Sequence, residues 1–169
     1  MKKVGLFISL LIMIGGIIGC SSSSNNNVDV SFDDIYDEIK DKVADDIGEG
    51  FEGYQDVDLL NDDSDDAELY QEMISLETDG LENAKILGTL INVNADEIIL
   101  IEASDEESLN SAQVSLEDHL EDEYQVWEKY LPDQFEKVDN NIIKTKGDFL
   151  IYITYENPEA IEDIFDSHF

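Results

Sequence analysis

The sequence contains one cysteine, Cys20, among 169 residues. With a single cysteine the chain cannot form an internal disulfide, and it has no cysteine cluster for a metal and no free thiol nucleophile once Cys20 is modified. Stability must therefore come from packing. The apolar content of 42% and a length typical of one domain are sufficient for a buried core.

Arginine is also missing, since all nine basic residues are lysines, and they face 42 acidic residues, giving a formal net charge of −33. Nucleic acid is excluded as a partner because phosphate binding needs clustered cations. The absence of arginine removes the side chain that binds carboxylates and phosphates in a bidentate way. The acidity has two interpretations, a soluble, self-repelling surface or the attraction of cations and cationic partners.

Signatures of catalysis are scarce as well. The chain has no Gly-x-Ser-x-Gly motif, no glycine-rich phosphate loop and no zinc motif, so we expect a non-enzyme with no catalytic residues and no cofactor. Its two histidines are His119, predicted at the surface beside acids with a raised pKa, and His168, predicted in a frayed C-terminus. Because carboxylates are abundant, a carboxylate-based hydrolase stays open as an alternative.

The first twenty residues predict where the protein resides. Lys2 and Lys3 precede an uncharged run from Val4 to Ile18, which is short for a spanning helix but typical of a secretory signal. The segment 17–20, Ile-Ile-Gly-Cys, resembles the lipobox of bacterial lipoproteins, which implies cleavage before Cys20 and a diacylglycerol on its sulfur. The alternative is an uncleaved short anchor with an incidental cysteine.

This assignment divides the chain into three parts. Residues 1–19 are the expected signal peptide, residues 20–28 the lipidated cysteine and a Ser/Asn tether, and residues 29–169 one acidic domain. We expect the domain at the extracytoplasmic face of a bacterial membrane, attached only through the lipid on Cys20, because its charge is repelled by anionic lipids.

Hydrophobic spacing predicts alternating helices and strands. Helical periodicity starts at Phe32 after the cap Ser31. Residues 49–66 have no regular pattern, which leaves open one short strand there. A long amphipathic helix begins with a capping box of Ser104 and Glu107 and is ended by Pro132. The remaining elements are a helix over 67–76, strands over 84–93, 97–103, 138–145 and 149–155, and a last helix from Asn157.

Together these elements predict an α+β fold. We expect an antiparallel-rich sheet of about four strands, with the long helix packed on one face and additional short helices. The strand over 97–103 is apolar without alternation, which favours a central position covered on both faces.

The second half resembles a known family. The segment NADEIILIEASD, a long helix ending in Trp127, Tyr130 and Pro132, and the strand KGDFLIYIT are similar to a domain of unknown function found in lipoproteins of clostridia and related Gram-positive bacteria. The resemblance covers about residues 81–165. It implies an envelope location and this fold, and no particular chemistry. Where the family usually has a basic residue in the long helix, this chain has His119, which departs from a fixed positive charge.

One acidic stretch has the spacing of a calcium loop. Asn61, Asp63 and Asp65 stand at the first, third and fifth positions of an EF-hand-like pattern, and Glu72 stands at the twelfth. The sixth position is Asp66 where the turn requires glycine, so a solvated acidic loop is the competing interpretation and we assign no metal ligands.

Three functions remain open. The leading hypothesis is a non-catalytic, lipid-anchored surface protein that binds a protein, peptide or other envelope ligand, or has a structural role in the envelope. A calcium-dependent module using residues 61–72 is the first alternative, and a carboxylate hydrolase with two acids in one cleft is the second.

Overall fold

The computed structural model describes residues 30–60, 65–89 and 93–169. Five strands, five α-helices and one 3₁₀ helix alternate along these residues. Their order is α1 (Phe32–Ile47), η1 (Gly48–Gly53), β1 (Gln55–Asp58), α2 (Asp65–Ile74), β2 (Leu81–Gly88), β3 (Glu97–Ala103), α3 (Glu106–Trp127), α4 (Pro132–Asp139), β4 (Ile142–Lys146), β5 (Phe149–Thr154) and α5 (Pro158–Ser167).

The strands form one sheet in the order β1-β2-β3-β5-β4, and every neighbouring pair is antiparallel. The predicted α+β class with an antiparallel sheet is therefore confirmed. The sheet has five strands because the segment expected to be irregular contributes β1, which pairs with β2 at one edge. β4 and β5 form a hairpin, whose turn includes Gly147 at a φ of 60°.

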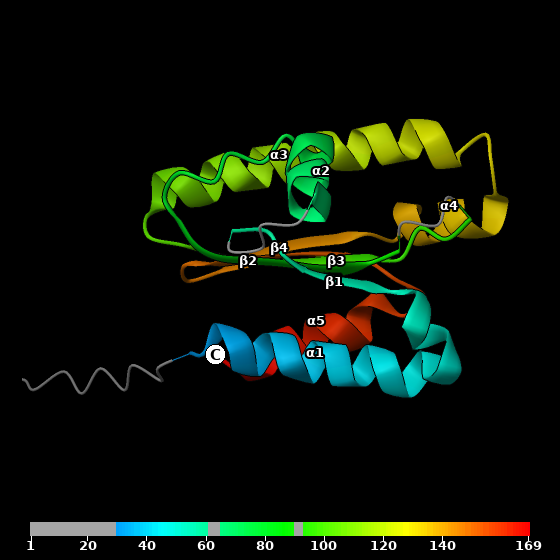
Figure 1. Cartoon of the computed structure of the whole chain (residues 1–169), viewed down its shortest axis with the longest axis horizontal. Helices are drawn as coiled ribbons and strands as arrows, with labels where there is room; N and C mark the ends of the chain where they lie inside the picture. The colour runs from blue at the N-terminus through cyan, green and yellow to red at the C-terminus, as the bar shows by residue number, and fades with distance from the viewer. Residues whose placement is uncertain (1–29, 61–64, 90–92) are drawn as a thin grey trace, which may run out of the picture.

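Helices cover both faces of the sheet (Figure 1). α2 and α3 lie on one face, with α4 beside the end of α3, while α1 and α5 lie together on the other face. The long helix thus packs on one face as predicted. The C-terminus lies beside the start of α1, where His168 Nε2 is 2.9 Å from the Glu38 carboxylate.

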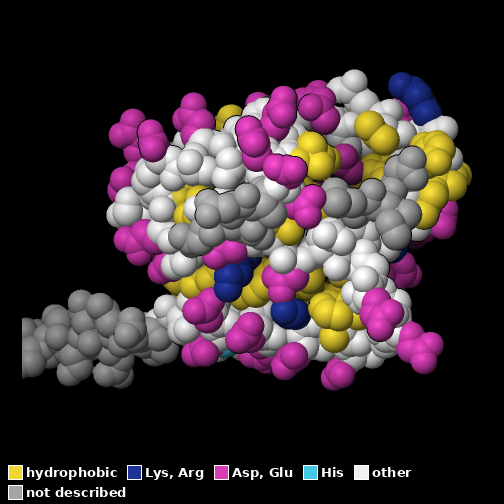
Figure 2. All heavy atoms as spheres, in the orientation of Figure 1, with side chains coloured by type: hydrophobic (Ala, Val, Ile, Leu, Met, Phe, Trp, Pro, Cys, Tyr) yellow, Lys and Arg dark blue, Asp and Glu magenta, His cyan; other side chains and the backbone are white. Residues whose placement is uncertain are grey.

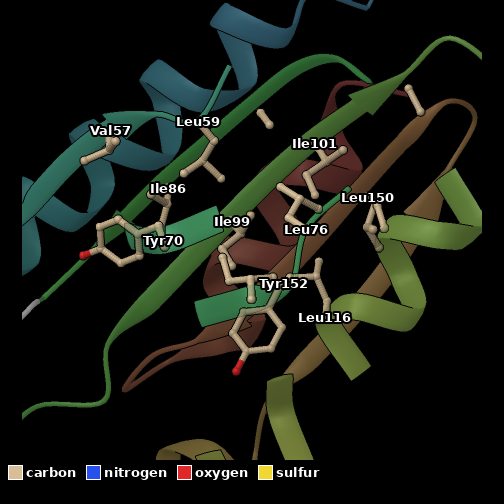
Figure 3. Close-up of a cluster of buried hydrophobic side chains, with 14 of the residues drawn as sticks. Val57, Leu59, Tyr70, Leu76, Ile86, Ile99, Ile101, Leu116, Leu150 and Tyr152 are labelled. Atoms are coloured by element: carbon tan, nitrogen blue, oxygen red, sulfur yellow. The ribbon is translucent and has the colours of Figure 1, made fainter. Parts of the chain in front are cut away.

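Two apolar layers fill the space between sheet and helices. In β3, Ile99 and Ile101 pack toward α2 and α3, whereas Ile98 and Leu100 pack toward α1 and α5. This confirms that β3 is a central strand covered on both sides, because alternate side chains of a strand point to opposite faces. Figure 3 shows the first layer, in which β1, β2, β3 and β5 contribute side chains that meet those of α2 and α3.

Helix starts show where the local predictions were right and where they were wrong. Ser31 caps α1 by accepting a hydrogen bond from the Asp34 amide at 3.3 Å, as predicted. The prediction that Ser104 caps α3 is wrong. Asp105 accepts from the Ser108 amide at 2.8 Å, because the Ser104 hydroxyl is instead bonded to the Gly80 carbonyl at 2.9 Å.

Pro132 was expected to end the long helix and does something different. α3 ends at Trp127, and Pro132 occupies the first turn of a separate helix, α4. Proline suits this position because the first helical amides need no intrahelical acceptor. The strand predicted over 138–145 is correspondingly shorter, since Val138 is buried in α4 and β4 begins at Ile142.

Acidic side chains cover much of the surface shown in Figure 2. The acids of α3 lie mostly on its solvent side, where Glu106, Glu107, Glu117 and Glu121 are exposed. Apolar side chains reach the surface at several places, of which Met73 and Val126 matter for the site described next.

Candidate functional site

A pocket of about 280 Å³ lies between α2, the second half of α3, and the end of the sheet where β2 stops and β3 begins. We call it the α2/α3 pocket. Its volume is close to the lower limit of small-molecule sites, which span roughly 300–1,000 Å³. Among the residues that line it are Tyr70 and Met73 from α2, Glu97 from β3, and His119, Glu123, Val126 and Trp127 from α3.

His119 and Glu97 form an ion pair across the pocket wall. His119 Nε2 lies 2.8 Å from Glu97 Oε2, and only 5% of the histidine is exposed. Burial alone would lower the pKa of His119, but the hydrogen bond and charge of Glu97 outweigh it and raise the pKa above 6.5. The His119 ring also packs against Tyr152, with centroids 5.8 Å apart.

The predicted surface position of His119 is therefore wrong, although the raised pKa is confirmed. Residue 119 follows Leu116 by three positions, and side chains three apart share one helix face. The buried positions of α3 include Leu109, Ala112, Leu116 and His119. Their spacing of three, four and three residues is the helical pattern that identifies position 119 as one that faces inward.

Glu123 is another carboxylate of the α2/α3 pocket, one turn beyond His119. It accepts a hydrogen bond from the indole N–H of Trp127, and burial is the largest cause that raises its pKa above 4.5. Trp127 is the last residue of α3 and is buried against Ala95 and Val138. It also lines the pocket, which sequence reasoning missed.

Tyr70 contributes a hydroxyl with no partner. The residue is only 3% exposed, and among the described residues nothing makes a hydrogen bond to its oxygen. Burial and then the nearby charge of Glu97 raise the pKa of Tyr70 well above 10, so the hydroxyl stays protonated. Buried polar groups are normally bonded, so an unpaired hydroxyl in a pocket wall indicates where a bound molecule or water would be held.

The floor of the pocket is held in place by Asp96. Its Oδ1 pairs with Lys137 Nζ at 2.6 Å, and its Oδ2 accepts from Asn94 Nδ2 at 3.0 Å and from the Tyr54 hydroxyl. The Ala95 amide donates to Gln134 Oε1 at 3.0 Å. These bonds connect residues 94–96 to α4 and to Tyr54, the residue that follows η1. This side of the pocket is therefore pre-organised.

Charges in the α2/α3 pocket are unbalanced. Lys137 neutralises Asp96, and His119, when protonated, neutralises Glu97, so the carboxylate of Glu123 is left in excess. The mouth is apolar, since Met73 is 48% and Val126 is 54% exposed. The pocket therefore combines surplus hydrogen-bond acceptors inside with hydrocarbon at its rim.

Of the other residues singled out in the sequence, those that the structure describes do not line this pocket. Cys20, Asn61 and Asp63 lie outside the described residues. Asp65 and Glu72 both belong to α2, whereas in an EF-hand the fifth and twelfth positions converge on one ion from a loop. Within the described ranges, no three His, Cys, Asp or Glu side chains gather in a way that could hold a metal ion.

His168 is also placed differently from its prediction. It forms the C-terminal cap of α5 rather than a frayed end, and its ring is 20% exposed beside Glu38 of α1. This contact joins two helices of the same layer, and neither residue lines the α2/α3 pocket.

Among the described helices, none has the length and apolarity required to cross a membrane.

One known protein family matches more than half of the chain. The family described as "Domain of unknown function (DUF4358)" matches residues 55–155, from the start of β1 to the residue after β5. The chain belongs to the DUF4358 family. No curated protein and no solved structure matches the chain.

The DUF4358 region contains the complete sheet together with α2, α3 and α4. All the residues that line the α2/α3 pocket fall inside it, whereas α1 and α5 lie outside. The resemblance seen in the sequence, over about residues 81–165, is confirmed as an uncharacterised domain, and the matched region extends further toward the N-terminus, to β1. The pocket is thus a feature of the DUF4358 domain itself.

Proposed function

We propose that this DUF4358 protein is a non-catalytic binding module of the bacterial cell envelope, anchored by a lipid on Cys20, that holds a ligand in the α2/α3 pocket. The observation that carries the binding role is the buried, unpartnered hydroxyl of Tyr70 in the wall of a pocket that is also lined by three carboxylates. The lipobox-like segment 17–20 and the polar residues 21–27 support the anchor.

The arrangement of the domain fits attachment at its N-terminal end. The described chain begins beside the start of α1, at one end of the molecule and on the opposite face of the sheet from α3 (Figure 1). The C-terminal half of α3, with the α2/α3 pocket, lies toward the other end. A domain tethered through its N-terminus would therefore present the pocket away from the bilayer.

The anchor is tested by metabolic labelling with an alkyne fatty acid in a bacterial host, followed by membrane fractionation. We expect the wild-type chain to carry the label and to remain with the membrane. Cys20→Ala should lose the label and leave the membrane fraction, or accumulate as unprocessed precursor. Full labelling of Cys20→Ala with unchanged fractionation would contradict the anchor.

The binding role is tested on the full chain in detergent by following the indole ¹⁵N–¹H signal of Trp127. The chain has one tryptophan, so the spectrum has one such signal, and it reports on the pocket. A small-molecule extract of the cell envelope should shift this signal in the wild type and less in Tyr70→Phe. An unchanged signal at saturating extract would count against a ligand in this pocket.

A carboxylate hydrolase is the second candidate, because one pocket contains Glu97 and Glu123, and the pKa of Glu123 is raised by burial as a general acid requires. The same indole signal distinguishes the two functions. A binding module keeps the shifted signal for hours, whereas a hydrolase returns it to the free or product position as the ligand is consumed, and Glu123→Gln would stop that return.

A further inference from the structure

The ligand chemistry follows from which hydrogen-bonding groups of the α2/α3 pocket are already used. Three side-chain N–H groups of its lining already donate to the protein's own carboxylates, His119 Nε2 to Glu97, Trp127 Nε1 to Glu123 and Asn94 Nδ2 to Asp96. Within the described part of the chain, no bond is made to the other oxygen of either carboxylate, and the Tyr70 hydroxyl has no partner. Because the free oxygens of Glu97 and Glu123 only accept, a ligand that satisfies them must bring donors, and the Tyr70 hydroxyl can accept from such a donor as well.

Charge makes the same demand. Glu123 is in excess over the cations of the pocket, and the whole chain has a formal net charge of −33. An anionic ligand would be repelled, and a neutral one would leave a desolvated carboxylate uncompensated. A metal ion is a poor fit, because the described residues contain no cluster of three suitable ligands and the ring nitrogen of His119 that faces Glu97 is engaged.

The mouth of the pocket adds a requirement for hydrocarbon. Met73 and Val126 line the pocket and are each about half exposed, and Trp127 also lines it. A methylene stem would cover these side chains, and a cation near an indole ring gains further from its negative face. An ammonium group on a short aliphatic stem meets all three demands, since it has three donors, a positive charge and an apolar body.

We propose that the α2/α3 pocket binds a primary alkylammonium group, with the nitrogen held by the Tyr70 hydroxyl and the carboxylates of Glu97 and Glu123 and the stem against Met73, Val126 and Trp127. This inference rests on the proposed binding function and names its ligand class. The same chemistry is found in a free alkylamine and in the side chain of lysine, and a volume of about 280 Å³ suits a stem of a few methylenes.

The test is a titration of Trp127 fluorescence in the full chain in non-ionic detergent at pH 7.5. The probes are butylammonium chloride and Nα-acetyl-lysine amide, compared with butanol, sodium butyrate and sodium chloride at equal ionic strength. We expect a saturable change with the two amines alone. Tighter binding of butylammonium would identify a free amine as the better source, and tighter binding of the lysine derivative would identify a lysine side chain.

Matched variants locate the binding. Tyr70→Phe removes one hydroxyl that supports no other described group, and Glu123→Gln keeps the shape and the acceptor for Trp127. Each should weaken amine binding by about tenfold, the effect of one hydrogen bond to a charged group. Glu121→Gln makes the same charge change at an exposed position of α3 and should alter the dissociation constant by less than about twofold.

Three results would overturn the inference. If butanol or butyrate binds as well as the amines, the pocket binds ligands but not through an ammonium group, and the binding function survives. If all three variants weaken binding equally, the amines are only counterions of an acidic surface. If no probe changes Trp127 fluorescence, the ammonium assignment fails, and the binding function is judged separately by the indole signal with envelope extract.

Discussion

His119 Nε2 lies 2.8 Å from Glu97 Oε2, and this pair joins the middle of α3 to the first residue of β3. Only 4% of the histidine side chain and 14% of the glutamate side chain are exposed. The pair therefore fixes the long helix over the sheet at the position where the α2/α3 pocket opens. Its effect on the free energy of unfolding can be measured.

The His119–Glu97 pair predicts a pH-dependent stability. Because the folded-state pKa of His119 is raised above its ordinary value of 6.5, the stabilisation is complete below about pH 6.5 and is lost as the pH rises through the folded-state pKa. We expect the free energy of unfolding, measured with urea from pH 5.5 to 9, to fall toward high pH in the wild type.

His119→Gln should lose this pH dependence and, because it leaves Glu97 buried without its cation, cost about 3 kcal/mol at pH 6. His168→Gln, at the end of α5, is the control and should keep the wild-type profile. A wild-type profile that is flat above pH 6, or equal slopes in the wild type and His119→Gln, would contradict the role of the pair.

Replacing the buried Glu123 by glutamine is expected to stabilise the protein. Burial raises its pKa above the ordinary value of 4.5, so its contribution to stability is complete below about pH 4.5 and is lost as the pH rises through the folded-state pKa. Glu123→Gln should therefore raise the unfolding temperature at pH 7 and have little effect near pH 4. Glu121→Gln, exposed on the same helix, should not show this difference between the two pH values. A lower unfolding temperature for Glu123→Gln at pH 7 would contradict the assignment.

The N-terminal cap of α3 predicts different effects on stability for two substitutions of Asp105. Asp105 accepts from the Ser108 amide at 2.8 Å, so Asp105→Ala should lower the free energy of unfolding by about 1 kcal/mol. Asp105→Asn keeps an acceptor oxygen and should recover most of that loss. Urea unfolding of both variants checks this, and equal losses for alanine and asparagine would show that the side-chain acceptor is not what stabilises the helix start.

Divalent cations are predicted to act on this protein only as salt. Asp65 and Glu72 lie on one helix, seven residues apart, which at 1.5 Å per residue is about 10 Å and too far for one ion. Calcium, magnesium and sodium chloride at equal ionic strength should raise the unfolding temperature to a similar extent. A shift specific to calcium that disappears in Asp63→Asn would restore the loop as a site.

Much of the architecture could be predicted from periodicity. In β5, Phe149, Ile151 and Ile153 pack in one layer and Leu150 and Tyr152 in the other, as alternation along a strand predicts whatever the strand packs against. Helix ends were less predictable, since Ser104 and Asp105 are both good caps and a distant carbonyl, that of Gly80, determines which one is free to serve.

The α2/α3 pocket could not be predicted in the same way. Its residues come from α2, β3 and α3, and neither Tyr70 nor Glu97 is distinctive in a sequence with 42 acids and seven tyrosines. What distinguishes them is burial without a partner at Tyr70 and pairing with His119 at Glu97, and both depend on how the layers pack. Only the inward position of His119 was available from helical spacing.

The most direct measurement is a crystal structure of the full chain with butylammonium at pH 7.5. We expect an ammonium nitrogen within about 3 Å of the Tyr70 hydroxyl oxygen and of a carboxylate oxygen of Glu97 or Glu123, with the stem against Val126. Water alone in the α2/α3 pocket at a saturating amine concentration, or the amine bound only to surface acids, would contradict it.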